Sequence, residues 1–321
     1  MIQRHSLFIS ALLIFSLGIC IHSLSHRAIS QNVPFSAGSP TKVLAVYEPW
    51  FGHPQHIDVG YSSQDPITLK KQIEQAKRQG ISGFVVDWYG DREPFIDKSY
   101  ALLQPIAEEQ HFNIAMMYDE TDKDADEATD DAITALDEFH ERYLAPDARG
   151  SKAYLTYQGR PVIFIFPKGR HTDWNRVRAD VNRWSAPPLL VYEYGQTPYA
   201  SAFDGFYAWV NPGKKGWSAD GANWGEDYLR DFYQAMRTKF SDKLAIGAAW
   251  PGFDDRKASW GLGRYMSRRC GATMTDTMKI ASQNPEPFLL IATWNDYEEG
   301  TAVERPPAKC DSASENSRAS Q

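Results

Sequence analysis

Short apolar runs alternate with longer amphipathic stretches along most of this 321-residue chain. Each run is rich in β-branched, leucine or aromatic residues, a composition typical of strands that are buried on both faces. The alternation of strand-like and helix-like patterns predicts a parallel sheet. Eight runs are expected to form strands, at residues 43–47, 83–87, 113–118, 162–166, 189–194, 205–210, 244–250 and 288–293.

Six amphipathic stretches between these runs predict helices, at residues 66–79, 97–110, 124–143, 173–184, 226–240 and 272–282. In the first, Leu69, Ile73 and Ala76 recur at helical spacing, with Lys and Gln on the other face. Eight strands with intervening helices predict an α/β fold of the (β/α)8 TIM-barrel type. No glycine-rich phosphate loop follows the first strand, so an open dinucleotide-binding sheet lacks its usual support.

Two places depart from a regular barrel pattern. The link at 195–203 is too short for a normal helix, and after the last strand the chain runs into a polar tail. We therefore expect the eighth outer helix to be short or missing. A tight hairpin is expected around 157–160, leading into the fourth strand.

The first residues are expected to lie outside the barrel. Arg4 and His5 precede an apolar stretch at 6–24, so residues 1–30 are interpreted as a signal peptide or an uncleaved amino-terminal anchor. We expect a linker at 31–41, a catalytic barrel at 42–305 and a polar tail at 306–321. The protein should be exported, as a periplasmic, extracellular or membrane-anchored protein, and should contact a membrane only if the segment is uncleaved.

Composition narrows the functions to be considered. The formal net charge is −7 and no basic run occurs, which argues against nucleic acid as a partner. His53 and His56 share one loop without a third ligand, so no metal site is expected, and no cofactor is expected either. A Gly-x-Ser-x-Gly nucleophile motif is absent from the sequence. Cys270 and Cys310 could form one disulfide, but the sequence leaves this pairing open.

Acids and aromatic rings gather where most of the predicted strands end. Barrel enzymes carry their chemistry at these carboxyl ends, and carboxylates with rings suit a sugar-binding cleft. Two carboxylates are the minimal set for cleaving a glycosidic bond, and Asp296 and Glu299 leave the same strand end. We therefore expect Glu299 to be the general acid and Asp296 the base. The candidate substrate contacts are Tyr47, Trp50, Trp88, Tyr89, Tyr118, Glu120, Trp250 and Asn295.

The stretch from Asn295 to Glu304, NDYEEGTAVE, resembles the strand-eight motif of glycoside hydrolase family 99, the endo-α-mannosidases. The Trp-Asn-Asp-Tyr run that begins at Trp294 also resembles the corresponding signature of family 71, the α-1,3-glucanases. Residues 47–51, 83–90 and 154–166 also resemble the corresponding segments of family 99. The resemblance implies that Glu299 is the acid/base and that Asp296 acts on the sugar 2-hydroxyl or on water. Because family 71 is regarded as inverting and family 99 as retaining, we leave the stereochemical outcome open.

The principal hypothesis is a glycoside hydrolase that cleaves α-linked glycans of the α-mannan or α-glucan type, with an oligo- or polysaccharide as its substrate. The alternative is a carbohydrate-binding barrel that has lost catalysis, because Tyr297 and Glu298 stand where family 99 has Trp and His. A third hypothesis is another barrel hydrolase that depends on a metal.

Overall fold

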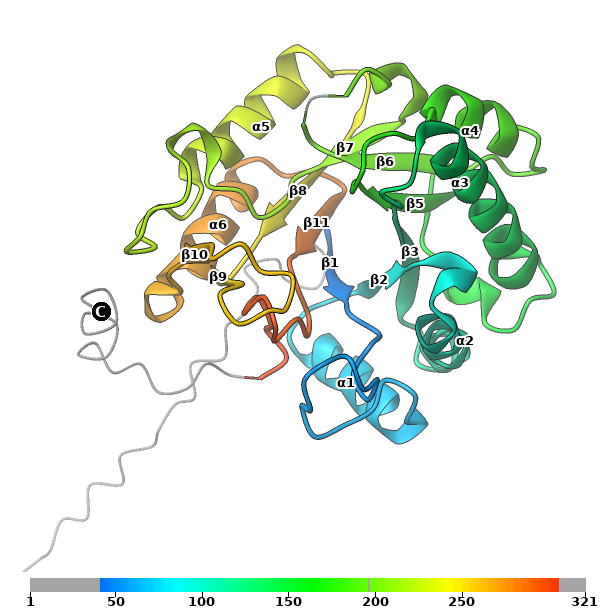
Figure 1. Ribbon diagram of the computed structural model, residues 1–321, viewed down its shortest axis with the longest axis horizontal. Coiled ribbons are helices and arrows are strands. Elements are labelled where there is room, and N and C mark those ends of the chain that lie inside the picture. The colour runs from blue at the N-terminus through cyan, green and yellow to red at the C-terminus, as the bar shows by residue number, and fades with distance from the viewer. Residues whose placement is uncertain (1–40, 196, 306–321) are drawn as a thin grey trace, which may run out of the picture. The chain divides into compact units, whose positions relative to one another are not determined.

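Eight parallel strands close into a barrel in the computed structural model, which describes residues 41–195 and 197–305 (Figure 1). The neighbours run β1-β2-β3-β5-β6-β7-β8-β11, and pairing of β1 with β11 closes the ring. This arrangement confirms the predicted barrel. The eight strands are β1 (Lys42–Tyr47), β2 (Gly83–Trp88), β3 (Asn113–Asp119), β5 (Arg160–Phe166), β6 (Leu189–Glu193), β7 (Gly205–Tyr207), β8 (Leu244–Ala249) and β11 (Phe288–Ile291).

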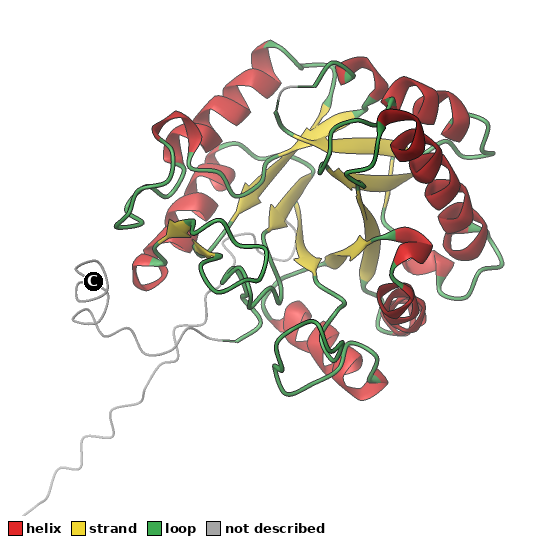
Figure 2. Cartoon of the chain, in the orientation of Figure 1, coloured by secondary structure: helices red, strands yellow, loops and turns green. Residues whose placement is uncertain are grey.

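Six α-helices surround the barrel in the described part of the chain (Figure 2). They are α1 (Pro66–Arg78), α2 (Pro94–Glu109), α3 (Ala125–Phe139), α4 (Trp174–Val181), α5 (Glu226–Thr238) and α6 (Ala272–Gln283). Only a 3-10 turn, Ala200–Ala202, connects β6 to β7, and no helix follows β11 as far as residue 305. Both departures from a regular barrel agree with the prediction from the sequence.

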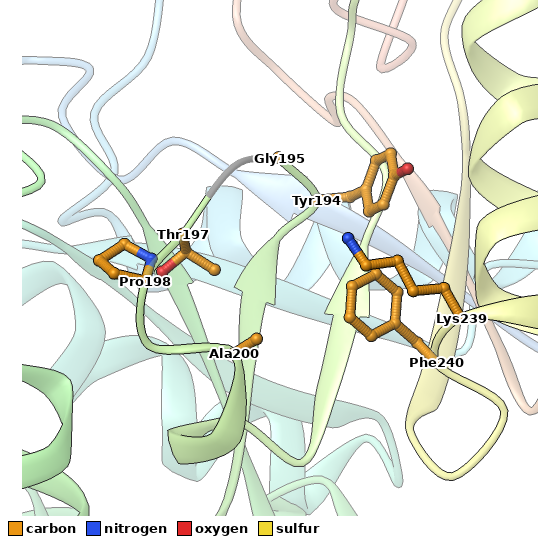
Figure 3. Close-up of a pocket in the computed structure, with 7 residues that line it drawn as sticks. All are labelled: Tyr194, Gly195, Thr197, Pro198, Ala200, Lys239 and Phe240. Carbon is orange, nitrogen blue, oxygen red and sulfur yellow. The ribbon is translucent and has the colours of Figure 1, made fainter.

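A hollow of about 820 Å³ lies beside the short β6–β7 link (Figure 3). On one side are residues that follow β6, and on the other Lys239 and Phe240, which follow α5. The hollow contains no acidic side chain among its lining residues. It shares no lining residue with the cleft described below, so the two are distinct. The residues that line it are Tyr194, Gly195, Thr197, Pro198, Ala200, Lys239 and Phe240.

Helix α1 shows how local sequence fixes an outer element. The Asp65 side chain accepts hydrogen bonds from the backbone N–H groups of Ile67 and Thr68, and Pro66 occupies the first helical position. Leu69 and Ile73 are fully buried against the barrel. Capping therefore sets where α1 begins, and its apolar face sets its orientation.

The predicted hairpin joins β4 (Thr156–Tyr157) to β5 in an antiparallel pair. Gln158 and Gly159 have φ of 51° and 76°, as a two-residue turn of type I′ requires. A second small hairpin pairs β9 (Phe253–Asp254) with β10 (Tyr265–Met266) after β8. This second hairpin forms part of the cleft wall.

The terminal segments, 1–40 and 306–321, lie outside the described residues. The predictions of a signal peptide or anchor, a linker and a polar tail fall on or border these segments and stay predictions. Within 41–195 and 197–305, no helix is both long and apolar enough to cross a membrane. Cys270 is disulfide-bonded, whereas Cys310 lies in the tail outside the described part.

Candidate active site

A cleft of about 720 Å³ opens at the carboxyl ends of the barrel strands. Its walls come from the ends of β1, β2, β3 and β5, from the segments that follow β1, β2, β5, β7 and β11, and from the loop between β9 and β10. Six acidic side chains and two cationic ones, Lys168 and Arg264, line it. The acids are Glu48, Asp87, Glu93, Asp119, Asp296 and Glu299.

Asp296 is fixed by a tight turn that begins where β11 ends. Its backbone N–H donates to Thr293 Oγ1 at 2.8 Å, and its Oδ1 accepts from the backbone N–H groups of Glu298 and Glu299 at 2.9 and 2.8 Å. The side chain is nearly fully buried but still lines the cleft. One carboxylate oxygen therefore holds the turn, and this bonding orients the second oxygen.

Glu299 lies three residues further along the same turn, and 20% of its side chain is exposed. Its Oε1 accepts a hydrogen bond from Trp260 Nε1 at 3.1 Å, and Arg264 Nη2 lies 3.8 Å from the same oxygen. Its backbone carbonyl accepts from Asp254 N–H at 2.7 Å. The β9–β10 hairpin and its loop thus contact both the backbone and the carboxylate of Glu299.

Three more acids lie at the carboxyl ends of the neighbouring strands β1, β2 and β3: Glu48, Asp87 and Asp119. Each of them is more than nine-tenths buried. Asp119 pairs with Lys168 Nζ at 2.9 Å, and this ammonium group also lies 4.8 Å from the centre of the Tyr89 ring. One oxygen of each acid is buried without a hydrogen-bond partner: Glu48 Oε2, Asp87 Oδ1 and Asp119 Oδ1. Such groups are costly to bury, so a ligand that donates hydrogen bonds is expected here.

Burial of these acids in one cleft disfavours their charged forms. It raises the pKa of Asp87 and of Glu48 well above the ordinary range, and neighbouring carboxylates add to both shifts. The pKa of Asp296 is also raised well above the ordinary range, mainly by burial and secondly by the nearby charge of Glu299. Burial also raises the pKa of Glu299, against the opposing effects of Trp260 and Arg264. For Asp119, burial raises the pKa and Lys168 opposes the shift.

Aromatic rings wall the cleft beside the strand-eight turn. The Trp50 ring stacks on His56 with centroids 4.7 Å apart, and the Trp260 ring meets both edge-on at about 6 Å. His56 Nδ1 lies 2.7 Å from Glu298 Oε2, so the next acid of the turn holds this ring. Rings with one open face are suited to packing on the CH faces of sugars.

The structure brings four of the ten candidate residues from the sequence into the cleft: Asp296, Glu299, Trp50 and Tyr89. The other six do not line this cleft. Three of these are rings whose polar atoms bond to the outer helices. Tyr47 bonds to Gln72, Trp88 to Asp97 and Tyr118 to Asp131.

The remaining three candidates hold the surrounding loops. Asn295 makes two hydrogen bonds of 2.8 Å to the backbone of Glu48, one to its N–H and one to its carbonyl. The buried Glu120 accepts from the backbone N–H groups of Lys168 and Arg170. Trp250 donates to the carbonyl of Trp224. These contacts support the site without forming its surface.

Alternation along the strands explains which residues were missed. Successive side chains of a strand point to opposite faces, so an outward ring is followed by an inward residue. At the ends of β1, β2 and β3, one residue of each adjacent pair faces the cleft and its neighbour points outward. The residues that line the cleft are Glu48, Asp87 and Asp119, and their outward neighbours are Tyr47, Trp88 and Tyr118. Lys168, Trp260 and Arg264 come from loops, for which the sequence carries no comparable signal.

Among the described residues, no group of three or more His, Cys, Asp or Glu side chains is arranged to hold a metal ion. Residues 56–318 match the sequence profile of glycosyl hydrolase family 71. The chain belongs to this family. The match covers most of the barrel, including the whole strand-eight turn, and the family 71 assignment implies a carbohydrate substrate. No curated protein sequence matches this family 71 chain.

Solved structures share the barrel of this family 71 protein at low sequence identity. The family 99 endo-α-mannosidase of Bacteroides thetaiotaomicron, in complex with BIS-TRIS-propane, superposes with a TM-score of 0.65 at 19% identity, over 84% of this chain and 88% of that one. A second structure of this enzyme gives 0.65 at 17%, over 84% and 89%. A glycoside hydrolase-like protein gives 0.56 at 14%, over 85% and 89%. These likenesses establish the fold alone.

Proposed function

We propose that this family 71 protein hydrolyses α-linked glycans, with Glu299 as the general acid and Asp296 as the base. The observation that carries the proposal is the shared cleft: both acids leave one turn at the end of β11 and face a cavity with further buried carboxylates and rings. Two carboxyl groups beside one glycosidic bond are sufficient for its hydrolysis.

The chemistry assigns one proton transfer to each acid. Glu299 donates its proton to the glycosidic oxygen while the bond from that oxygen to the anomeric carbon breaks, and the electron pair goes to the oxygen. Asp296 accepts a proton from the attacking group, which is water or the 2-hydroxyl of the sugar. In either case one water is consumed overall. Burial raises the pKa of both acids, so it helps Glu299 to keep its proton but disfavours the ionised form that Asp296 needs as a base.

The α linkage is supported by similarity. The strand-eight motif resembles those of α-1,3-glucanases and endo-α-mannosidases, and the B. thetaiotaomicron structure bears the latter name. We therefore propose α-1,3-glucan or α-mannan as the substrate class. The proposed export of the protein rests on residues 1–30, which lie outside the described part.

We propose that the three acids at the ends of β1–β3 bind the glycone, which is the sugar whose anomeric carbon is attacked. Glu48, Asp87 and Asp119 offer unpartnered oxygens to sugar hydroxyl groups, and Lys168 adds a donor at the same place. A hydroxyl-rich ligand would satisfy groups that otherwise stay buried without partners.

Replacement of Glu299 by Gln tests the assignment. This variant should lower kcat on α-1,3-gluco-oligosaccharides or α-manno-oligosaccharides by about 10²–10⁴-fold, while binding measured by calorimetry persists. Glu109→Gln, on the exposed side of α2, is the matched control and should retain wild-type turnover. Undiminished turnover by Glu299→Gln contradicts the assignment. Product anomers followed by NMR would settle the stereochemical outcome.

The second candidate function is sugar binding without cleavage. One observation favours it: Trp260 and Arg264 both stabilise the charged form of Glu299, whereas a general acid must be protonated. A binding protein of this kind would hold the same oligosaccharides in calorimetry and release no reducing ends. Wild-type protein that binds but never cleaves these substrates would establish this alternative.

A further inference from the structure

The loop between β9 and β10 places a large exposed ring beside the proposed proton donor. Trp260 is 41% exposed and Leu262 is 79% exposed, and both line the cleft. Among the described residues, only two other large hydrophobic side chains are this exposed, Ile57 and Ile67. An exposed indole on the wall of a polar cleft is suited to binding a ligand that has both apolar faces and hydroxyl groups.

The loop is held rigidly, so the position of this ring is defined. The Asp255 carboxylate is fully buried and accepts hydrogen bonds from Leu262 N–H at 3.1 Å, from Arg264 N–H at 2.6 Å and from Arg264 Nε at 2.6 Å. Arg264 also packs its guanidinium 4.9 Å from the centre of the Phe253 ring. These contacts tie the loop that carries Trp260 back to the base of its own hairpin.

Strand order places the hairpin that carries this loop and the three-acid site on opposite sides of β11, and the Trp260 ring in the loop also contacts Trp50 and His56, which follow β1. Around the barrel the sequence of neighbours is β3-β2-β1-β11-β8, so β11 separates the strands of the three acids from β8 and the hairpin that follows it. A general acid protonates the oxygen that joins the glycone to the leaving group. If the three acids bind the glycone, the leaving group must therefore extend from Glu299 towards the β9–β10 loop.

We propose that Trp260 forms the binding surface for the sugar on the leaving-group side and, through its indole N–H, holds the Glu299 carboxyl at the glycosidic oxygen. This inference rests on the proposed function. Trp260 is thus both a substrate-contacting residue and a positioning residue for the acid. The cleft accordingly has a direction, with the glycone at β1–β3 and the leaving group at the hairpin.

Two variants test the two proposed roles of Trp260 separately, contact with the substrate and positioning of Glu299. Trp260→Phe keeps an aromatic ring but loses the N–H that donates to Glu299 at 3.1 Å. Because that bond favours the ionised carboxylate, its loss raises the pKa of Glu299, and the high-pH limb of the activity profile should move to higher pH. Trp260→Ala loses the ring as well, so binding of the leaving-group sugar should also be lost.

The substrates for this test differ only on the leaving-group side. We compare α-1,3-glucotetraose or α-mannotetraose with the matching glycobiosyl α-fluoride, which has no leaving-group sugar and needs little protonation. Trp260→Ala should lower kcat/KM on the tetrasaccharide by about 10- to 100-fold, and on the fluoride by less than about 3-fold. Ile67→Ala removes another exposed apolar side chain, on α1 and outside the cleft, and serves as the control.

Three outcomes overturn the proposal in distinguishable ways. An equal loss on both substrates in Trp260→Ala excludes a role specific to the leaving group. An unmoved high-pH limb in Trp260→Phe excludes the indole N–H as a determinant of Glu299. Inactivity of the unmodified protein on tetrasaccharides and fluorides alike overturns the proposed function itself, and the inference with it. An unfolding temperature equal to that of the wild type in both variants verifies that the hairpin is intact.

Discussion

Replacing Asp87 by Asn should stabilise the protein at neutral pH while weakening its binding of sugar. Asp87 is 7% exposed and lacks a partner at Oδ1. Burial and the nearby Asp119 raise its pKa well above the ordinary range, so folding makes its ionisation unfavourable. Asparagine has nearly the same shape and no charge, and it removes this penalty.

The sign and size follow from proton linkage. A carboxyl group whose pKa is higher in the folded state binds more protons there, so the free energy of unfolding falls as pH rises. For one group the slope is at most about 1.4 kcal/mol per pH unit, between the ordinary aspartate pKa near 4 and the raised native value. Relative to wild type, Asp87→Asn should gain about 1–3 kcal/mol at pH 7 and almost nothing near pH 4.

Urea denaturation at several pH values between 4 and 8 measures this gain, and thermal unfolding should show a rise of about 2–4 °C per kcal/mol. Asp147→Asn is the matched control, because Asp147 is exposed on a loop after α3. Its effect on stability should stay within about 0.5 kcal/mol at every pH. Calorimetry with the oligosaccharide substrate should show weaker binding by Asp87→Asn and unchanged binding by the control.

The reasoning is refuted if Asp87→Asn is less stable than wild type at pH 7. That result would mean that Asp87 is ionised in the folded protein and is stabilised there by Lys168 or another donor. A gain that does not change with pH would also contradict it, since it would show that packing rather than charge is responsible.

Two further predictions concern residues that support the cleft. Asn295→Ala should lower kcat/KM by about 10-fold or more, because both hydrogen bonds to the Glu48 backbone are lost, and steady-state kinetics with a thermal-unfolding control measures this. Glu120→Gln should lower the free energy of unfolding by roughly 1–3 kcal/mol, because one amide oxygen cannot accept from Lys168 N–H, Arg170 N–H and the Trp174 indole together. Urea denaturation checks the second, and unchanged stability would contradict it.

Most of the barrel could be predicted because its strands and helices carry strong periodic patterns. Most of the errors lie at element ends, and one is a small hairpin that was not predicted. The seventh strand was expected at 205–210 but β7 ends at Tyr207, since Trp209 N–H bonds to the Tyr228 hydroxyl instead of a neighbouring strand. The second helix begins at Pro94 rather than at 97, because proline suits the first turn. The β9–β10 hairpin was missed, as two-residue strands show no period.

The candidate site was predicted less completely than the fold. The sequence marked the correct end of the barrel, because the carboxyl ends of parallel strands all meet there. It does not mark which of two adjacent residues faces the cleft, and the expected rings, Tyr47, Trp88 and Tyr118, do not line it. Each ring packs outward and bonds to a helix. Strict use of the two-residue period would have selected the acids beside them.

This alternation also explains why the site combines buried acids with rings that come from loops. At the ends of β1–β3, the outward positions need large side chains to fill the space under the helices, and the inward positions are left for small polar ones. The rings that wall the cleft beside the strand-eight turn come instead from segments that leave the barrel, as Trp50 and Trp260 do. The ends of β1–β3 therefore supply the three buried acids, whereas the loops supply the rings of Trp50 and Trp260 and the remaining charged groups of the cleft. Changes in loop sequence should accordingly alter which glycan is bound, while changes at Glu48, Asp87 or Asp119 should weaken binding of every glycan.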